Sequence, residues 1–433
     1  MVRLTKRFDI IIVVLFVLIT LTIWGFMMPL TERFFDYGTS MHSLGQITGL
    51  IGTVLFALSL LLTTKLKFVE NTSSGLDKTY KLHHIIGAIS FMVLLFHPIL
   101  LVVKFIPDNW ALAATYLWPS SSWAVNFGII SLVSMIVLLV LTFYVKLNYK
   151  SWKISHTYLG WAFVIACLHI FLITTDISRS NLLKAWMIFV CAIGLLSFFY
   201  GSYFKNLLKK QFKYSVEDVK KSGPFTTIIM KPKNKEMKYK AGQFIFVKFD
   251  AEDFKESHPF TIASAPNNKK EIRLVIKSLG DYTSKINELP KGATATIDGP
   301  YGKFNFMKEN KDQIWIAGGV GVTPFLSFAQ SLNDNNKFKK KIDMYYCTRD
   351  EKEQIYADEL KSVANKNKNF NLIEFCASTK GQINAELIDK TLKIKDKAIF
   401  LCGPPQMMNS LKSQFLKAGV KKRNIFMEDF GFK

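Results

Sequence analysis

The chain has 433 residues, of which 49% are hydrophobic, and its mean hydropathy of +0.18 is too high for an ordinary soluble protein. Its net charge of +23 comes from lysines and arginines spread over loops and over a mixed-charge second half. Because nucleic-acid-binding proteins gather basic residues into one patch or stripe, this dispersal excludes nucleic acid as an expected partner.

Six apolar stretches occupy the first half of the sequence, and each is near the ~20 residues that cross a lipid bilayer. They span residues 9–29, 44–64, 82–103, 124–146, 156–174 and 185–204. The first lacks a small-residue cleavage site and is followed by further stretches, so we expect a retained helix rather than a signal peptide. The pattern predicts a six-helix membrane domain over residues 1–208.

Loop charges predict the orientation, because Lys and Arg stay on the cytoplasmic side of short loops. Positive residues gather before the first stretch, in the second and fourth loops, and after the last stretch: Arg3, Lys6, Arg7, Lys65, Lys67, Lys78, Lys81, Lys146, Lys150, Lys153, Lys205, Lys209, Lys210 and Lys213. The other loops hold little beyond Arg33, Lys104, Arg179 and Lys184. We therefore expect a multi-pass protein of the cell membrane with both termini in the cytoplasm.

Four of the seven histidines fall in two stretches at matched spacing: His83 and His97 in the third, and His156 and His169 in the fifth. Each spacing corresponds to about 20 Å along a helix at ~1.5 Å per residue. Because both stretches run outward, His83 and His156 share one depth, and the other two share a second depth. Two facing imidazoles at each depth suit two low-spin b-type haems with bis-histidine ligation.

Other interpretations of these histidines remain. His84 is an alternative to His83, which is preferred because His83 with Gly87 repeats the spacing of His156 with Gly160. A glycine one turn from the histidine would leave room for a flat macrocycle. Histidines that only pack are disfavoured by the register of four, and a diiron or copper centre is disfavoured by the lack of carboxylates in the spans. His42, near the outer end of the second stretch, is expected to be structural or interfacial.

The second half begins as short strands rich in β-branched and aromatic residues. They are predicted at Phe225–Met230, Gln243–Phe249, Glu271–Lys277 and Thr294–Ile297, and they predict an antiparallel barrel over residues 209–310. From residue 311 the order changes to a strand at Gln313–Ala317, a glycine loop at Gly318–Gly321, a helix at Phe325–Leu332 and a strand at Ile342–Cys347. This alternation predicts an α/β domain with a parallel sheet over residues 311–433.

Three segments of the predicted barrel are typical of a flavin site, and they are His258–Ser264, Lys277–Thr283 and Gly299–Gly302. In the first segment an aromatic side chain can cover the flavin ring, and the hydroxyl of Thr261 can reach its N5 edge. A cationic or donor residue beside them can meet the pyrophosphate. The residues that we expect to bind FAD are His258, Pro259, Phe260, Thr261, Ser264, Lys277, Gly280, Thr283, Gly299 and Tyr301.

The α/β half carries a candidate nucleotide site. In the glycine loop, backbone N–H groups can approach a pyrophosphate at a helix N-terminus, and Cys402 would place a thiol beside the nicotinamide. Arg349 can pair with the 2′-phosphate of NADPH, although Asp350 beside it leaves NADH possible. The expected nucleotide residues are Gly318, Gly319, Gly321, Thr323, Pro324, Arg349, Cys402, Gly403 and Pro404. At the C-terminus, Phe430 is expected to shield the flavin until nicotinamide displaces it, with Phe432 behind.

Taken together, the four histidines, His-Pro-Phe-Thr at 258–261, the loop at 318–324, Cys-Gly-Pro-Pro at 402–405 and the aromatic C-terminus resemble the NADPH oxidase and ferric reductase superfamily. The resemblance covers nearly the whole chain. It implies a ferric-reductase-type membrane domain followed by a ferredoxin-reductase-like module. It also implies hydride transfer from NADPH to FAD and single-electron flow to an inner haem, an outer haem and an outside acceptor, which in the oxidases is dioxygen and gives superoxide.

Departures from the family pattern keep some alternatives open. Gly381-Gln382 stands where relatives often have Gly-Arg for the 2′-phosphate, which favours NADH more than the rest of the pattern does. The chain shows no calcium-binding extension and no large outer loop, so a compact bacterial-type member is expected. The competing functions are a ferric-chelate reductase, an electron-relay subunit that serves an extracytoplasmic protein, and a reductase with merely structural membrane helices.

Overall fold

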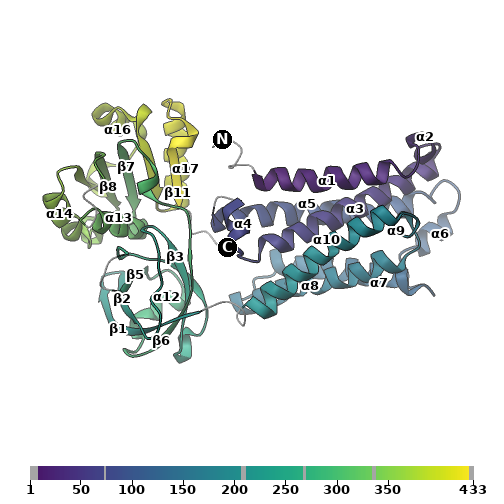
Figure 1. The fold of residues 1–433 in the computed structure, drawn as a ribbon, viewed down its shortest axis with the longest axis horizontal. Coiled ribbons are helices and arrows are strands. Elements are labelled where there is room, and N and C mark those ends of the chain that lie inside the picture. Colours follow the sequence, from purple (N-terminus) through teal and green to yellow (C-terminus); the bar gives the residue numbers. More distant parts are fainter. Residues whose placement is uncertain (1–7, 73–74, 206–210, 267–269, 334–337, 429–433) are drawn as a thin grey trace. The chain divides into compact units, whose positions relative to one another are not determined.

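A computed structural model describes residues 8–72, 75–205, 211–266, 270–333 and 338–428. It divides the chain into two compact units, Met1–Lys209 and Lys210–Lys433 (Figure 1). The described part of the first unit is built from helices, and that of the second unit contains two β-sheets with helices around them.

The long helices of the first unit follow the predicted apolar stretches. Their bounds are α1 Phe8–Gly25, α3 Tyr37–Leu62, α5 Leu76–Val103, α7 Trp123–Phe143, α8 Tyr149–Leu172 and α10 Asn181–Phe199. Shorter pieces are α2 Leu30–Arg33, α4 Lys67–Thr72, α6 Trp110–Thr115, α9 Asp176–Arg179 and the π-helix η1 Tyr200–Phe204. In the described residues, 5 helices are long and apolar enough to cross a membrane, and Ile10–Gly25 is a shorter apolar helix. A multi-pass helical domain is thus confirmed, with the first stretch shorter than expected.

Polar caps move several helix starts ahead of the apolar stretches. The Asp36 carboxylate accepts a hydrogen bond from the Thr39 N–H at 2.7 Å, which begins α3 at Tyr37. Asn148 caps α8 and Ser180 caps α10 in the same way. Such side chains satisfy the N–H groups that the first helical turn leaves without an intrahelical partner.

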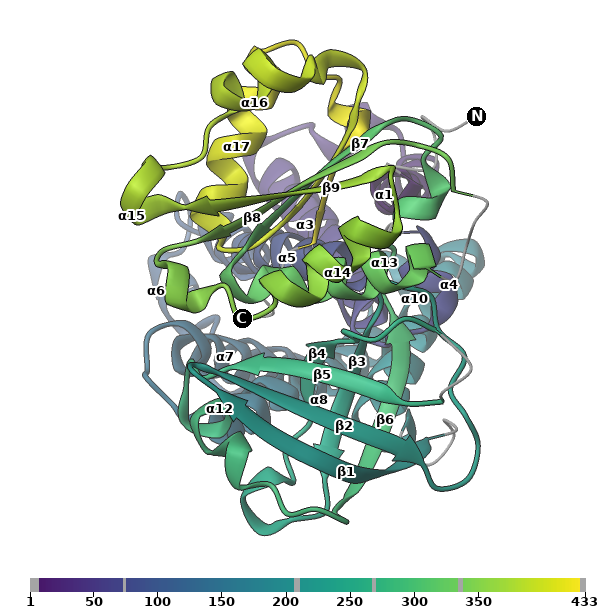
Figure 2. The same ribbon diagram turned by 90° about the vertical axis from the view of Figure 1, so that its left-hand side faces the viewer.

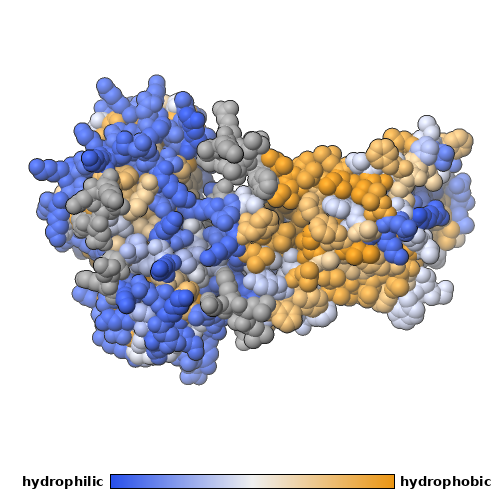
Figure 3. Space-filling view, in the orientation of Figure 1, coloured by the Kyte–Doolittle hydropathy of each residue, from blue (hydrophilic) through white to orange (hydrophobic). Residues whose placement is uncertain are grey.

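The surface of the helical unit is suited to lipid. Figure 3 shows hydrophobic residues over the visible sides of its long helices, whereas the visible surface of the second unit is mostly hydrophilic. Large apolar side chains such as Ile89 and Met92 on α5 and Val133 on α7 are exposed. Because a soluble monomer rarely exposes so large an apolar surface, these faces are expected to contact acyl chains.

The first sheet of the second unit forms the predicted barrel. Its strands are β1 Phe212–Ser222, β2 Phe225–Pro232, β3 Phe244–Phe249, β4 His258–Thr261, β5 Ile272–Lys277 and β6 Thr294–Tyr301, in the antiparallel order β4-β3-β6-β1-β2-β5. A bridge between Ile262 and Leu274 brings the two edges together, which closes the curled sheet. The short helix α12, Asp281–Lys285, follows β5.

The second sheet is parallel and belongs to an α/β domain. Its strands are β7 Gln313–Gly318, β8 Ile342–Thr348, β9 Phe370–Cys376, β10 Ala398–Cys402 and β11 Ile425–Glu428, in the order β11-β10-β7-β8-β9. The helices α13 Thr323–Asn333 and α14 Ala357–Lys366 lie on one side in Figure 2, and α16 Ala385–Leu392 and α17 Pro405–Lys417 on the other. Trp315 packs in the core under α13, and Ile316 in the core under α17, because neighbouring strand residues face opposite sides.

Candidate functional site

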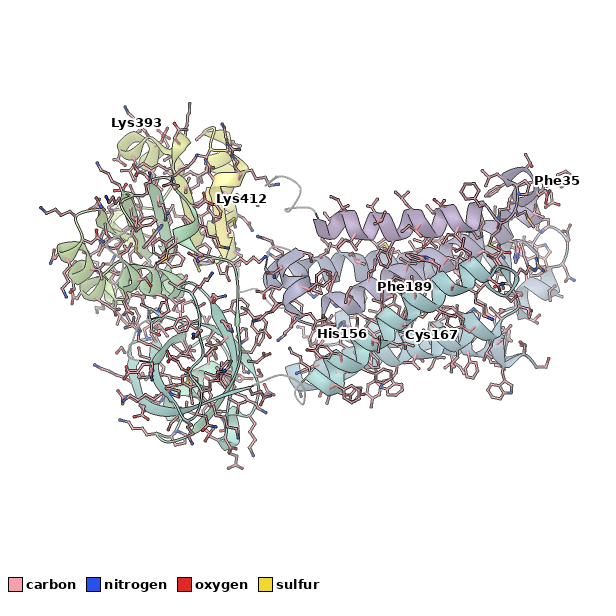
Figure 4. All side chains as sticks on the ribbon, viewed as in Figure 1. Phe35, His156, Cys167, Phe189, Lys393 and Lys412 are labelled. Atoms are coloured by element: carbon pink, nitrogen blue, oxygen red, sulfur yellow. The ribbon has the colours of Figure 1, made fainter. Side chains whose placement is uncertain are left out.

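Two pairs of histidines face each other between α5 and α8. The rings of His83 and His156 have centroids 5.9 Å apart, and those of His97 and His169 lie 6.3 Å apart. The first histidine of α5 meets the first of α8, and the second meets the second, so the two helices run in the same direction. Figure 4 labels His156 in this bundle, with Cys167 further along α8.

Three of the four imidazoles are oriented by backbone carbonyls on neighbouring helices. The Nδ1 atom of His97 lies 2.7 Å from the Gly45 oxygen, and that of His169 lies 2.7 Å from the Ala124 oxygen. His83 Nδ1 lies 3.0 Å from the Ser59 oxygen. A carbonyl oxygen only accepts, so each Nδ1 carries the proton and each Nε2 keeps its lone pair for a metal.

His156 is held differently. Its Nδ1 is buried and has no hydrogen-bond partner in the described residues. Its ring is instead stacked on Trp152, with centroids 5.3 Å apart and an interplanar angle of 9°. Stacking fixes the plane of the ring but leaves the tautomer free.

Glycines let two of these imidazoles approach the neighbouring helix. A Cβ atom on Gly49 would lie 2.8 Å from His97 Nδ1, and one on Gly128 would lie 2.8 Å from His169 Nδ1. Gly160 has another role than expected, because a Cβ atom there would overlap the ring of Phe198. The interpretation of Gly160 as room for a macrocycle is therefore wrong, since helix α10 fills that space. A Cβ on Gly87 would meet only the Ser59 hydroxyl, at 3.4 Å.

The remaining histidines of this unit lie outside the two pairs. His84 is exposed, and its ring centroid lies 5.7 Å from that of His83. His42 Nδ1 lies 3.4 Å from Lys104 Nζ at the end of α5. Within the described residues, no three His, Cys, Asp or Glu side chains converge as a metal site. Each level therefore offers two ligands, and a metal held there needs further ligands from another molecule.

The predicted flavin motif at residues 258–264 forms strand β4 and the loop after it. His258 packs on Tyr282 of α12, with ring centroids 3.9 Å apart. The Tyr282 hydroxyl is buried and has no hydrogen-bond partner among the described residues. Burial and the nearby Glu256 raise the pKa of Tyr282 above its usual value of 10.0, so this hydroxyl remains a neutral donor. Tyr282 lies inside the Lys277–Thr283 segment, yet the sequence alone did not single it out.

Ser264, at the end of this loop, is tied into the barrel. Its Oγ lies 2.9 Å from the Tyr239 hydroxyl and accepts the Arg273 N–H at 3.1 Å. The Tyr239 hydroxyl also donates to the Ala265 carbonyl at 2.8 Å. Burial raises the pKa of Tyr239 to about 12, which keeps it a donor at physiological pH. These bonds fix the loop that follows Thr261, which is itself buried.

The other expected flavin residues lie in two places. At the start of α12, the Thr283 hydroxyl accepts N–H groups from Leu279 and Gly280, at 2.9 and 3.1 Å. Lys277 ends β5, with its Nζ 5.8 Å from the Phe225 ring centroid. Gly299 and Tyr301 lie near the end of β6, where the Tyr301 hydroxyl donates to Asp298 at 2.8 Å. The structure thus places them on the barrel, and their contact with FAD stays a prediction.

The glycine loop lies at the switch point of the parallel sheet. The chain leaves β7 toward β8 on one side, whereas β10 lies on the other, and ligands of such sheets bind at the carboxyl ends of these two strands. A Cβ on Gly321 would overlap the Cys402 carbonyl, and a Cβ on Gly318 would lie 2.6 Å from Met407. Gly319 has a φ of +54°, with open space beside it. The loop therefore needs glycine for close approach to residues 402–403 and for one left-handed turn.

The remaining nucleotide residues surround the same edge. Thr323 and Pro324 begin α13, while Gly403 and Pro404 lead into α17. Cys402 is fully buried at the end of β10. Arg349 is exposed after β8. Phe430 and Phe432 lie outside the described residues.

Three segments match protein families. Residues 48–167 match the ferric reductase like transmembrane component, residues 212–305 an FAD-binding domain, and residues 315–413 the oxidoreductase NAD-binding domain. With the fold, these matches identify a ferric-reductase-type membrane domain, followed by an FAD-binding domain and an oxidoreductase-type NAD-binding domain. The three domains in this order are the architecture of the NADPH oxidase and ferric reductase superfamily, as the sequence predicts.

Curated relatives and solved structures are similar to parts of this chain. The F subunit of the Na(+)-translocating NADH-quinone reductase of Pseudoalteromonas atlantica is 28% identical over 39% of this chain and 44% of its own length. The corresponding protein of Methylococcus capsulatus is 30% identical over 35% of this chain and 40% of its own length. The chain thus spans less than half of these relatives. A flavohemoglobin structure from Malassezia yamatoensis covers 90% of this chain and 97% of its own, with a TM-score of 0.51 and 18% identity, which concerns the fold alone.

Proposed function

We propose that this protein carries electrons from a cytosolic nicotinamide nucleotide, through FAD and two b-type haems, to dioxygen at the outer face of the cell membrane, giving superoxide. The observation that carries the proposal is the pair of facing imidazoles at each of two levels. When bound, FAD exchanges a hydride for single electrons, and bis-histidine haem carries one electron at a time.

The geometry of the histidines fits haem iron. Two imidazole nitrogens at about 2 Å on opposite sides of a metal hold their ring centres roughly 6 Å apart. The observed spacings of 5.9 and 6.3 Å agree with this value. The ligands would be His83 and His156 at the inner level, and His97 and His169 at the outer level. A bare metal ion would lack enough ligands here, whereas the macrocycle supplies four.

The protein residues around the cofactors have distinct tasks in this proposal. Backbone carbonyls on α3 and α7 hold protons on three imidazoles and so keep each Nε2 ready to bind iron. Tyr282 offers a buried hydroxyl beside His258, while Phe260 and Thr261 would meet the flavin ring. The close approach of Gly321 to Cys402 brings the two loops of the nucleotide site together. Phe430 would exclude water from the flavin until the nicotinamide arrives.

The nucleotide donor is NADPH in our proposal, because the exposed Arg349 follows β8, where the nucleotide ribose binds in this type of sheet. NADH is the second candidate. Asp350 and Gln382 favour it, and the curated relatives are named as NADH reductases. The ratio of kcat/KM for the two nucleotides decides between them.

Dioxygen is the proposed acceptor because iron ligated by two histidines offers no open coordination position. Electrons must then leave by outer-sphere transfer, which suits a small acceptor that diffuses through lipid. The test uses the purified protein with NADPH and FAD in air. Cytochrome c reduction that superoxide dismutase abolishes is expected. Reduction of chelated iron that is faster without oxygen, with no dismutase-sensitive signal, would identify a ferric reductase instead.

The haem assignment is tested separately with His169→Leu. This change removes one outer ligand, so roughly half of the dithionite-reduced b-type absorbance should disappear. Flavin reduction by NADPH should survive, because the second unit is untouched, while electron transfer to the outside stops. An absorbance spectrum identical to that of the unchanged protein would reject the ligand.

A further inference from the structure

Outside the two sites, a network of polar side chains joins the barrel to the α/β domain within the second unit. At its centre, the Glu359 carboxylate of α14 accepts two hydrogen bonds from the Arg273 guanidinium of β5, at 2.7 and 2.8 Å. The same carboxylate accepts the Gln330 side-chain N–H of α13 at 2.8 Å. One carboxylate thus holds one barrel strand and two helices of the other domain.

The network continues into the expected flavin loop. The Gln330 side-chain oxygen accepts the Ala265 N–H at 3.0 Å. The Ser327 hydroxyl donates to the Ser264 carbonyl at 2.6 Å. Arg273 also donates to the Ala263 carbonyl at 3.2 Å. Residues 263–265, directly after the flavin strand, are therefore held by these three polar contacts, two from α13 and one from β5, in addition to the bonds from Tyr239 and the Arg273 backbone N–H.

Helix α13 connects these contacts to the nucleotide site. It begins at Thr323, directly after the glycine loop, and Ser327 and Gln330 lie one and two turns further on. The helix is also embedded in a core that combines Phe325 and Phe328 with the barrel residues Ala263 and Val275. A shift of α13 against the barrel would therefore move the glycine loop against the flavin strand.

We infer that the Arg273–Glu359–Gln330 network is a positioning device that sets the distance between the nicotinamide and the flavin. Apolar packing alone permits small sliding motions, whereas a bidentate guanidinium–carboxylate pair fixes both distance and angle. A misplacement of about 1 Å can slow a reaction about 100-fold. The three side chains are positioning residues, because they act through residues 263–265 and helix α13 rather than by contact with a cofactor.

This inference rests on the proposed flavin and nucleotide sites, but it does not depend on the haems or on the acceptor. The measurement is anaerobic stopped-flow reduction of the flavin in the full-length protein by NADPH or NADH, whose first phase reports hydride transfer to the flavin and precedes electron transfer to the membrane unit. Glu359→Gln keeps the side-chain volume but cannot accept both bonds of the guanidinium. We expect the rate at saturating nucleotide to fall tenfold or more, with bound FAD and the half-saturating nucleotide concentration changed by less than about two-fold.

The chain offers a matched control on the same helix. Lys361 of α14 pairs with Glu374 of β9 at 2.8 Å, and both lie within the α/β domain. Glu374→Gln therefore removes an ion pair of the same kind without loosening the connection to the barrel, and its flavin reduction should match that of the unchanged protein. Equal rates in the Glu359 and Glu374 variants would overturn the positioning role. Absence of flavin reduction in the unchanged protein would instead refute the proposed sites.

A second variant keeps the inference testable if Glu359→Gln loses its flavin. Arg273→Lys preserves the charge but replaces the two-bond fork by a single ammonium group. Slow flavin reduction with full FAD content supports the positioning role. A rate equal to that of the unchanged protein contradicts it. Glu359→Asp, with Arg273 unchanged, should reduce its flavin faster than Glu359→Gln does, because it keeps a carboxylate with two acceptor oxygens.

Discussion

Each membrane histidine is oriented by a small number of neighbours, and these neighbours could not be read from the sequence. The spacing of the four residues predicts two levels, and the structure brings His83 to His156 and His97 to His169. The carbonyl acceptors, however, lie on α3 and α7, far away in the chain. A backbone oxygen carries no side-chain signal, so only the fold could reveal that Nδ1 is hydrogen-bonded in three of the four histidines.

Gly128 provides a test of this arrangement at one residue. The larger side chain in Gly128→Val would place its Cβ 2.8 Å from His169 Nδ1, so the imidazole must move and leave the Ala124 carbonyl. We expect the variant to lose roughly half of its b-type haem, because such outer partners typically contribute 10–100-fold to metal affinity. Haem content is measured from the reduced spectrum of protein extracted in mild detergent.

The control is Gly38→Ala at the start of α3, where the nearest atom to the new Cβ is the Asp36 carboxylate at 3.6 Å. It should retain the full haem content. Equal haem content in both variants would show that contact with Gly128 does not hold His169 in place.

At the scale of elements, hydrophobic patterns located the buried strands and missed the amphipathic ones. The strands predicted from β-branched residues appear as β2, β3, β5 and β6 with shifted ends. The eleven-residue β1 was not predicted, because its charged residues outnumber the buried Tyr214 and Val216. β9 was missed for a related reason, since Asn371 and Glu374 interrupt its apolar residues. Both strands are specified by their neighbours in the sheet more than by their own composition.

The glycine loop yields a prediction for an element. Gly321→Ala introduces a Cβ that overlaps the Cys402 carbonyl, so the loop must separate from residues 402–403 and the nucleotide site opens. We expect flavin reduction by the nucleotide to fall tenfold or more, while reduction by dithionite remains, because the flavin itself is still bound. Anaerobic absorbance spectra of the flavin follow both reactions.

A matched glycine change checks that the effect is local. Gly292 has a φ of +84° and open space around it, so Gly292→Asn adds a side chain that tolerates this conformation. Its flavin reduction should be normal. A normal rate in Gly321→Ala as well would mean that the contact between the two loops is not needed for nucleotide binding.

At the scale of the whole molecule, the structure sharpens the charge asymmetry that predicts orientation. Arg33 was counted as an outer-loop charge, but it is buried and pairs with Asp176 at 3.0 Å. Its guanidinium also lies 3.8 Å from the Trp24 ring centroid. A neutralised, buried arginine contributes little to orientation in the membrane. The loops predicted to lie outside therefore retain mainly Lys104, Arg179 and Lys184, against the larger set of basic residues predicted to be cytoplasmic.

This asymmetry predicts the side on which each substrate acts. Nicotinamide nucleotides do not cross a bilayer, so they should reduce the flavin and the haems only where the second unit faces the added solution. In membrane vesicles turned inside out, added NADPH should at once reduce both the flavin and the haems, as followed by their absorbance. Right-side-out vesicles should respond only after a mild detergent opens them, and an impermeant superoxide detector should give its signal in intact inverted vesicles only when it is trapped inside. A haem signal from NADPH in sealed right-side-out vesicles would place the termini outside and reverse the proposed direction of electron flow.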